Sequence, residues 1–147
     1  MSPDDWDALV IGTEAGRVEI AVTDELVDAY LATMELDLPC YLRPTPPFDR
    51  RIAPSDMVPK LAMSELSEAF CNRVAGPNIR AKQSFIFYAP VCVGTVVRAV
   101  SRLAEKYERR NRRFVTLEAL FVDPDDKPLV LDRRTQLVLP QDFSIKH

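Results

Sequence analysis

The sequence predicts an α+β fold in which one long central helix is wrapped by a curved antiparallel sheet of about five strands. The first observation is an apolar stripe at helical spacing within residues 55–77. The second is that four later segments alternate apolar and polar side chains, as strands with one buried face do: 79–90, 95–110, 112–123 and 129–139. The third is that turn-forming residues connect these segments, which favours an antiparallel meander.

The N-terminal part of the chain predicts one more strand and a short helix. Residues 16–23 alternate apolar residues with polar or small ones, and residues 23–34 repeat apolar residues at helical spacing. Thr23 is suited to cap this helix, and the acidic Asp24 and Glu25 favour its first turn. A long segment with five prolines follows, at Pro39, Pro44, Pro46, Pro47 and Pro54.

The central helix is expected to begin near Asp56. Ser55 can cap it, and Pro59 is tolerated only near a first turn. Gly76 is a typical helix end. The apolar stripe consists of Val58, Leu61, Ala62, Leu66, Ala69, Phe70 and Val74.

The alternation assigns one face of each later strand to the core. These faces hold Ile79, Ala81, Phe85 and Phe87; Val97, Ala99, Leu103 and Tyr107; Val115, Leu117, Ala119 and Phe121; and Leu129, Leu131, Leu137 and Leu139. The opposite face is also partly apolar, which favours a dimer or a larger assembly.

Composition suits a single domain over residues 1–147, with its core in 16–139. The net charge of −3 argues against a dedicated nucleic-acid binder, and no apolar run is long enough to span a membrane. The three cysteines lack metal-ligand spacing, so we expect no metal site and a reducing, cytoplasmic location. The one histidine is His147, at the end of the sequence, where an imidazole is poorly placed for catalysis.

Three stretches resemble the MaoC-like, (R)-specific enoyl-CoA hydratases, a family with the hotdog fold. They are "IAPSDMVPKLAMSEL" at the start of the central helix, residues 85–130 with "PVCVGT" before a strand and "KYERRNRRFV" around a hairpin, and "VTDELVDAYLATM" at the first helix. The resemblance implies an oligomer that binds an acyl thioester of coenzyme A or of acyl carrier protein, with no other cofactor. It also implies addition of water to a trans-2-enoyl thioester, or the reverse reaction.

The family motif Gly-Asp-x-Asn-Pro-Leu-His would fall in the proline segment. In members of the family, the Asp and the His of this motif hold one water for attack on the β-carbon of the substrate. Aligning Pro39 with the motif proline places Tyr41 at the His, and a slip of one residue places Asp37 at the Asp. Neither register supplies a histidine. Tyr41 could serve as a donor in place of the histidine, but buried packing with a satisfied hydroxyl explains it better.

The resemblance also implies a thioester site at the start of the central helix. Backbone N–H groups there would polarise the thioester carbonyl. The binding residues implied are Ala53, Pro54, Ser55 and Met57, with Asp56 as a further catalytic carboxylate. In the hairpin, Arg109, Arg110, Arg112 and Arg113 could hold the phosphates of coenzyme A, or could be solvated hairpin charges.

Three functional hypotheses follow. In the first, the chain is an accessory subunit that forms a heteromer with a catalytic MaoC-like subunit. In the second, it is a self-sufficient hydratase or acyl-CoA thioesterase that uses Asp37 or Asp56. In the third, it is a homodimer that binds acyl-CoA without catalysis.

Overall fold

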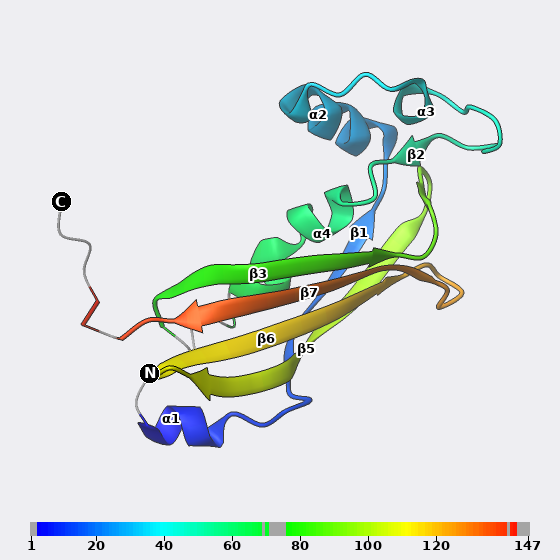
Figure 1. The fold of residues 1–147 in the computed structure, drawn as a ribbon. Coiled ribbons are helices and arrows are strands. Elements are labelled where there is room, and N and C mark those ends of the chain that lie inside the picture. The colour runs from blue at the N-terminus through cyan, green and yellow to red at the C-terminus, as the bar shows by residue number, and fades with distance from the viewer. Residues whose placement is uncertain (1–2, 69, 71–75, 141, 144–147) are drawn as a thin grey trace.

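The computed structural model describes residues 3–68, 70, 76–140 and 142–143. It confirms the α+β class: a five-stranded antiparallel sheet carries a helix on one face (Figure 1). The elements are α1 (Pro3–Ala8), β1 (Glu14–Ala21), α2 (Asp24–Met34), α3 (Pro39–Leu42), β2 (Ile52–Ala53), α4 (Met57–Leu61), η1 (Ser64–Glu68), β3 (Asn78–Phe87), β4 (Val91–Cys92), β5 (Val96–Arg109), β6 (Arg112–Val122) and β7 (Pro128–Val138).

The sheet has the strand order β1-β5-β6-β7-β3, and β2 pairs with β4 in a separate two-stranded ribbon. The three longest neighbouring strands, β5, β6 and β7, form a meander, as predicted. The β5–β6 connection is a two-residue turn at Arg110 and Asn111, which have φ values of 52° and 58°. Two positive φ angles match the right-handed twist of the flanking strands. The β5–β6 hairpin and α1 lie at one end of the sheet, and α2, α3 and β2 lie at the other (Figure 1).

Helix α2 begins as the sequence predicts. The Oγ1 of Thr23 accepts a hydrogen bond from the backbone N–H of Leu26 at 3.1 Å. Asp24 and Glu25 lie in the first turn, where a carboxylate interacts favourably with the helix dipole. The helix ends at Glu35, whose φ of 53° is the left-handed cap conformation.

The central helix begins next to Asp56, also as predicted. It is α-helical over Met57–Leu61 and π-helical over Ser64–Glu68. The predicted stripe residues Val58, Ala62, Leu66 and Phe70 are buried, whereas Leu61 is 41% exposed. Ala69 and Val74 of the stripe, and the stretch 71–75, lie outside the described residues.

Two apolar clusters form the core. The larger joins α2, α4 and the α2 end of the sheet, and includes Val27, Met57 and Phe121. The smaller joins α1, the central helix and the hairpin end of the sheet, and includes Trp6 and Leu103. Burying apolar surface between helix and sheet is the main force that holds these layers together.

The predicted core face of β7 is wrong beyond Leu129, which is buried in the larger core cluster as predicted. Val130, Asp132, Arg134 and Gln136 face the helix, because they lie opposite buried residues of the neighbouring strand β6. The alternation misled because Asp132 and Arg134 are charged, and unpaired charges belong in solvent. Here they neutralise each other inside the core, with Arg134 Nη2 2.6 Å from Asp132 Oδ2.

The predicted face of β3 is also wrong at its start. Phe85 and Phe87 pair with core-facing positions of β7, but a register shift between Arg80 and Lys82 reverses the earlier alternation. Ile79 consequently pairs with Leu137 on the outer face and is 52% exposed. A single extra residue in a strand moves the side chains beyond it to the opposite face.

In the described part of the chain, no helix is long and apolar enough to cross a membrane. Across the same residues, no group of three or more metal-ligating side chains comes together.

Candidate functional site

The carboxylate of Asp56 lies at the centre of a polar cluster where α2, α3 and α4 meet. The β2–β4 ribbon leads the chain into α4, and Asp56 is the residue that precedes its first turn. The Nζ of Lys60, one helical turn later, lies 2.6 Å from Asp56 Oδ2. The hydroxyl of Tyr30 on α2 donates to Asp56 Oδ1 over a long 3.5 Å.

Lys60 stays protonated in this cluster. Hydrogen bonds to Asp56 and to Tyr30 raise the pKa of Lys60 above its ordinary value, against a smaller opposing effect of burial. Both members of the pair are more than one-third exposed, so solvent screens much of their attraction. The cluster therefore presents a carboxylate and an ammonium group at a surface that water reaches.

Tyr41 lies close enough to the cluster to respond to its charge. It is half-buried on α3 and packs against the larger core cluster. Burial raises the pKa of Tyr41, and the nearby Cys40 and Asp56 raise it further. Tyr41 is consequently a neutral phenol at ordinary pH, which can donate a hydrogen bond but cannot act as a base.

Arg51 holds the proline segment against α2. Its guanidinium binds Asp24 at 2.9 Å, Asp28 at 2.6 Å and the backbone oxygen of Tyr41 at 2.5 Å. Burial would lower the pKa of Arg51, but the hydrogen bonds to Asp28 and Asp24 outweigh it and raise the pKa. The side chain is only 9% exposed, so this clamp joins α2 to α3 from within the fold.

The other proposed catalytic carboxylate does not join the cluster. Asp37 is exposed in the stretch between α2 and α3, and within the described residues it makes no hydrogen bond or ion pair. Of the predicted acid and donor groups, the structure therefore brings Asp56 and Tyr41 together and leaves Asp37 apart.

The predicted thioester-binding residues line the entry to α4. Ala53, Pro54 and Met57 are buried, and Ser55 is half-buried. The N–H of Met57 already donates to the carbonyl of Pro54 at 3.0 Å. Among the described contacts, the backbone N–H groups of Ser55 and Asp56 have no acceptor.

The four arginines of the β5–β6 hairpin lie far from Asp56. Strand β5 has 14 residues, which corresponds to about 40 Å between its ends. The strand begins beside the end of β1 that leads to α2, and it ends at Arg109. Within one chain the structure does not bring these arginines to the start of α4.

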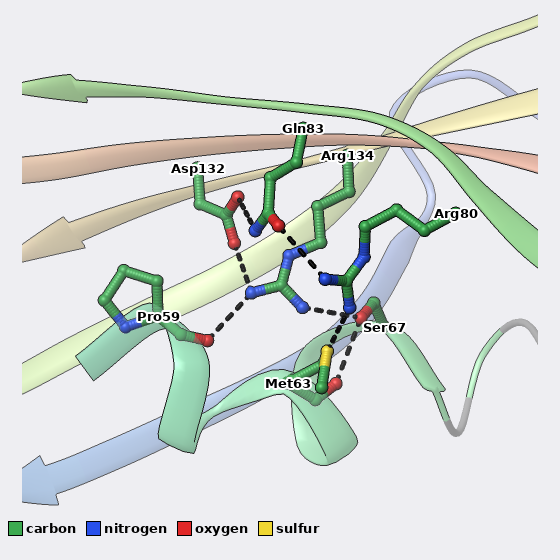
Figure 2. Close-up of polar contacts among 7 residues, drawn as sticks. All are labelled: Pro59, Met63, Ser67, Arg80, Gln83, Asp132 and Arg134. Atoms are coloured by element: carbon green, nitrogen blue, oxygen red, sulfur yellow. Dashed lines mark hydrogen bonds and ion pairs between the residues drawn. The ribbon is translucent and has the colours of Figure 1, made fainter. Parts of the chain in front are cut away.

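A buried ionic network behind the site holds the central helix against the sheet (Figure 2). Arg134 donates to the backbone oxygen of Pro59 at 2.8 Å and to Ser67 Oγ at 3.2 Å. Gln83 on β3 donates to Asp132 at 3.1 Å, which adds the edge strand to the network. The network therefore fixes the first turn of α4, and with it the position of Asp56.

Sequence reasoning missed three residues of the site region: Tyr30, Arg51 and Lys60. The spacing of Asp56 and Lys60, four apart on a helix, was a usable signal for their pairing. So was the spacing of Asp24 and Asp28, which places two carboxylates on one face of α2. No sequence pattern connects Arg51 or Tyr30 to their partners, because those contacts arise from the tertiary fold.

Residues 9–132 match the family described as FAS1-like, dehydratase domain region. Among solved structures, the (R)-hydratase from A. caviae involved in PHA biosynthesis is 25% identical, with a TM-score of 0.72 over 90% of this chain and 98% of that chain. The (R)-hydratase PhaJ1 from Pseudomonas aeruginosa is 19% identical, with a TM-score of 0.71 over 97% and 91%.

A third similar structure is the C-terminally truncated HadBC (3R-hydroxyacyl-ACP dehydratase) complex from Mycobacterium tuberculosis. It is 20% identical, with a TM-score of 0.73 over 88% of this chain and 98% of that chain. No protein of curated function matches the chain significantly.

The sheet, the central helix and these relatives define a hotdog-fold protein of the MaoC-like hydratase and dehydratase type. The chain belongs to the FAS1-like dehydratase region family, whose match covers most of its length. The predicted fold and the predicted resemblance are both confirmed.

Proposed function

We propose that this protein is an accessory subunit of a heteromeric (R)-specific enoyl-thioester hydratase or dehydratase. One observation carries the proposal: the stretch where the resemblance places the Asp and His contains an exposed Asp37 and the phenol of Tyr41, and no imidazole. A neutral phenol cannot accept the proton of the attacking water at neutral pH. The chain would therefore contribute binding surface while a partner supplies the catalytic pair.

Two further observations support a partner. One similar structure is described as a complex, HadBC. The edge strand β3 also carries apolar side chains in solvent, with Ile86 51% and Phe87 52% exposed, and Tyr88 just beyond it is 53% exposed. A long apolar edge strand is normally covered, because its unpaired backbone groups invite another strand.

The test is co-expression with a MaoC-like chain that carries the Asp-x-Asn-Pro-Leu-His motif. Size-exclusion chromatography with light scattering should detect a complex, and hydration of crotonyl-CoA should exceed that of either chain alone. Replacing the motif histidine in the partner should abolish turnover. If no complex forms with such chains and their activity does not change, the accessory role is wrong.

A second candidate function is a self-sufficient enzyme that uses Asp56. It is favoured by the cluster itself, in which Asp56, Lys60 and Tyr41 lie beside the free N–H groups at the start of α4. The purified chain should then hydrate crotonyl-CoA or hydrolyse saturated acyl-CoA by itself. Asp56→Asn should remove that turnover, whereas Asp37→Asn should not. Tight acyl-CoA binding without turnover would instead indicate the non-catalytic homodimer.

A further inference from the structure

The outer face of the sheet, which points away from the central helix, carries its side chains in rows that cross β5, β6, β7 and β3 (Figure 1). Two rows are apolar, one toward the α2 end and one toward the hairpin end: Val100, Leu120, Leu131 and Ile86, and Tyr107, Phe114, Leu137 and Ile79. Two polar rows lie between them: Arg102, Glu118, Arg133 and Ser84, and Glu105, Thr116, Thr135 and Lys82. The outer face therefore has two apolar bands with a charged band between them.

Both apolar bands meet solvent in the single chain. Leu120 and Ile86 are exposed in the first band, and Tyr107 and Ile79 are exposed in the second. The ring of Phe114 stacks on that of Tyr107 with centroids 5.1 Å apart, which fixes the orientation of both rings. Contiguous apolar patches on a folded chain mark a contact surface. The charged band between them indicates what covers this surface.

The charged band separates acids from bases at the line between β6 and β7. Glu105 and Glu118 lie on the β5 and β6 side, whereas Arg133 and Lys82 lie on the β7 and β3 side. Arg133 binds both acids within the chain, Glu105 at 2.9 Å and Glu118 at 2.8 Å. Lys82 has no ion-pair or hydrogen-bond partner among the described residues. The cation on the acidic side of the band, Arg102, donates to a backbone oxygen in the stretch before β1 at 3.3 Å.

We propose that a second copy of this chain covers the outer face, with the two-fold axis running along the strands between β6 and β7. This rotation sets each row against the same row of the second copy, and it exchanges β6 with β7 and β5 with β3. Glu118 then faces the partner subunit's Arg133, and Glu105 faces the partner subunit's Lys82. Each contact occurs twice, so the acidic side of each copy meets the basic side of the other, and the apolar bands cover each other.

A two-fold axis across the strands would fit these charges less well. It would exchange the two polar rows, so Lys82 would face the partner subunit's Ser84 and its charge would stay unpaired. Sheets that pack face to face lie about 10 Å apart with nearly aligned strands, which the axis along the strands allows.

This contact is independent of the proposed accessory role. Face-to-face packing uses the side chains of β3 and leaves the N–H and C=O groups along the free edge of that strand available. The outer face thus joins the chain to its own copy, while the β3 edge remains available to a catalytic partner.

Two charge reversals in the full chain test the contact. Lys82→Glu places an acid opposite the partner subunit's Glu105, and Glu105→Lys places a base opposite the partner subunit's Lys82. Both positions are exposed in the single chain, and each change sets like charges together twice in the pair. Light scattering across a concentration series should show each variant at half the mass of the natural assembly.

An equimolar mixture of the two variants is the decisive measurement. In a mixed pair, each of the two contacts again joins an acid and a base, so the mass should return to that of the natural chain. The two positions cannot compensate within one chain, because β5 and β3 are three strand spacings apart, about 14 Å.

Two further variants make the result specific. Lys127→Glu makes the same change of charge in the β6–β7 turn, outside the outer face, and should leave the mass unchanged. Leu120→Lys puts a charge into an apolar band and should halve the mass without touching the pair of Glu105 and Arg133. Circular dichroism checks that each variant is folded, and Leu120→Lys decides the result if Glu105→Lys does not fold.

The proposal is overturned if the natural chain is a monomer at every concentration, or if Lys82→Glu or Leu120→Lys keeps the natural mass. It is also overturned if the mixture of folded variants stays at the mass of its components. Assembly through the β3 edge alone would leave the mass of Leu120→Lys unchanged, and would contradict the proposal in the same way. No catalytic subunit is present in these measurements, so the accessory role stands or fails separately.

Discussion

At the scale of single residues, the site is defined by how each neighbour changes the chemistry of Asp56. Lys60 neutralises the carboxylate, and Tyr30 contributes one weak hydrogen bond. Tyr41 adds a half-buried phenol, and the nearby charge of Asp56 contributes to the raised pKa of this phenol. These groups can bind and polarise a ligand, but within the described residues none of them is an imidazole.

The titration of Tyr41 tests this arrangement. Because burial and the charge of Asp56 raise the pKa of Tyr41, its phenol should ionise above the ordinary value of 10.0. The ultraviolet absorbance difference between the natural chain and Tyr41→Phe isolates this group during a pH titration. A midpoint at or below 10 would contradict the placement of Tyr41 beside Asp56. In Asp56→Asn the midpoint should move back toward the ordinary value.

The same shift fixes the sign of a stability effect. A raised pKa means that the folded chain holds the Tyr41 proton more tightly than the unfolded chain does. The resulting contribution to stability is complete below pH 10 and is lost as the pH rises through the folded-state pKa. The free energy of unfolding of Tyr41→Phe should therefore decline less steeply above pH 10 than that of the natural chain.

Local signals predicted the residues whose roles are local. Thr23 caps α2, and Asp56 marks the start of the central helix, because capping and dipole effects act within one turn. Arg51 could not be found in this way, since its three acceptors come from α2 and α3. The position of Asp56 at the helix start was thus predictable from the sequence, and the contacts of Arg51 were not.

At the scale of elements, the buried pair Asp132–Arg134 decides how β7 meets the central helix. The alternation of leucines placed the other face of β7 inward, and only the pairing with β6 shows that the charged residues lie in the core. Both side chains are 3% exposed. The strand itself was predicted because its length and turns are local, but its orientation depended on a partner that the sequence did not identify.

Breaking this pair should be strongly destabilising. Arg134→Met leaves the buried Asp132 without its counter-ion and should lower the free energy of unfolding by about 3–5 kcal/mol, measured by urea denaturation. The double variant Asp132→Leu/Arg134→Met removes both charges and should cost less than the single change. A double variant whose loss equals the sum of the two single losses would show that the pair is not coupled.

The contact between β1 and η1 depends on the absence of a side chain at Gly16. A Cβ there would collide with the backbone carbonyl of Glu65, which cannot move without the helix. Gly16→Ala should therefore lower the free energy of unfolding by about 1–3 kcal/mol. Ala21→Ser, an exposed change of similar size on the same strand, is the control and should change stability by less than about 0.5 kcal/mol.

At the scale of the whole molecule, the two ends and the two edges of the sheet have different properties. One end carries the Asp56 cluster, and the other carries Arg109, Arg110 and Arg112 of the hairpin. One edge is β1, whose Gly16 packs against η1, and the other is β3, with its exposed apolar residues. This asymmetry agrees with a chain that completes its binding surface with another subunit, on the side of β3.

Ile86 is the best position at which to test that edge. It lies on β3 opposite Leu131 and is 51% exposed in the single chain. If another strand covers β3, Ile86→Lys forces a charge into an apolar contact, and light scattering should show the assembly fall to the monomer mass. Val10→Lys adds the same charge at a position that is 65% exposed between α1 and β1, and should leave the mass unchanged. Equal masses for the natural chain and Ile86→Lys, at concentrations where an assembly is present, would show that subunits meet elsewhere. The accessory role would then need a different contact surface, because the edge strand would no longer be available to explain how the partner binds.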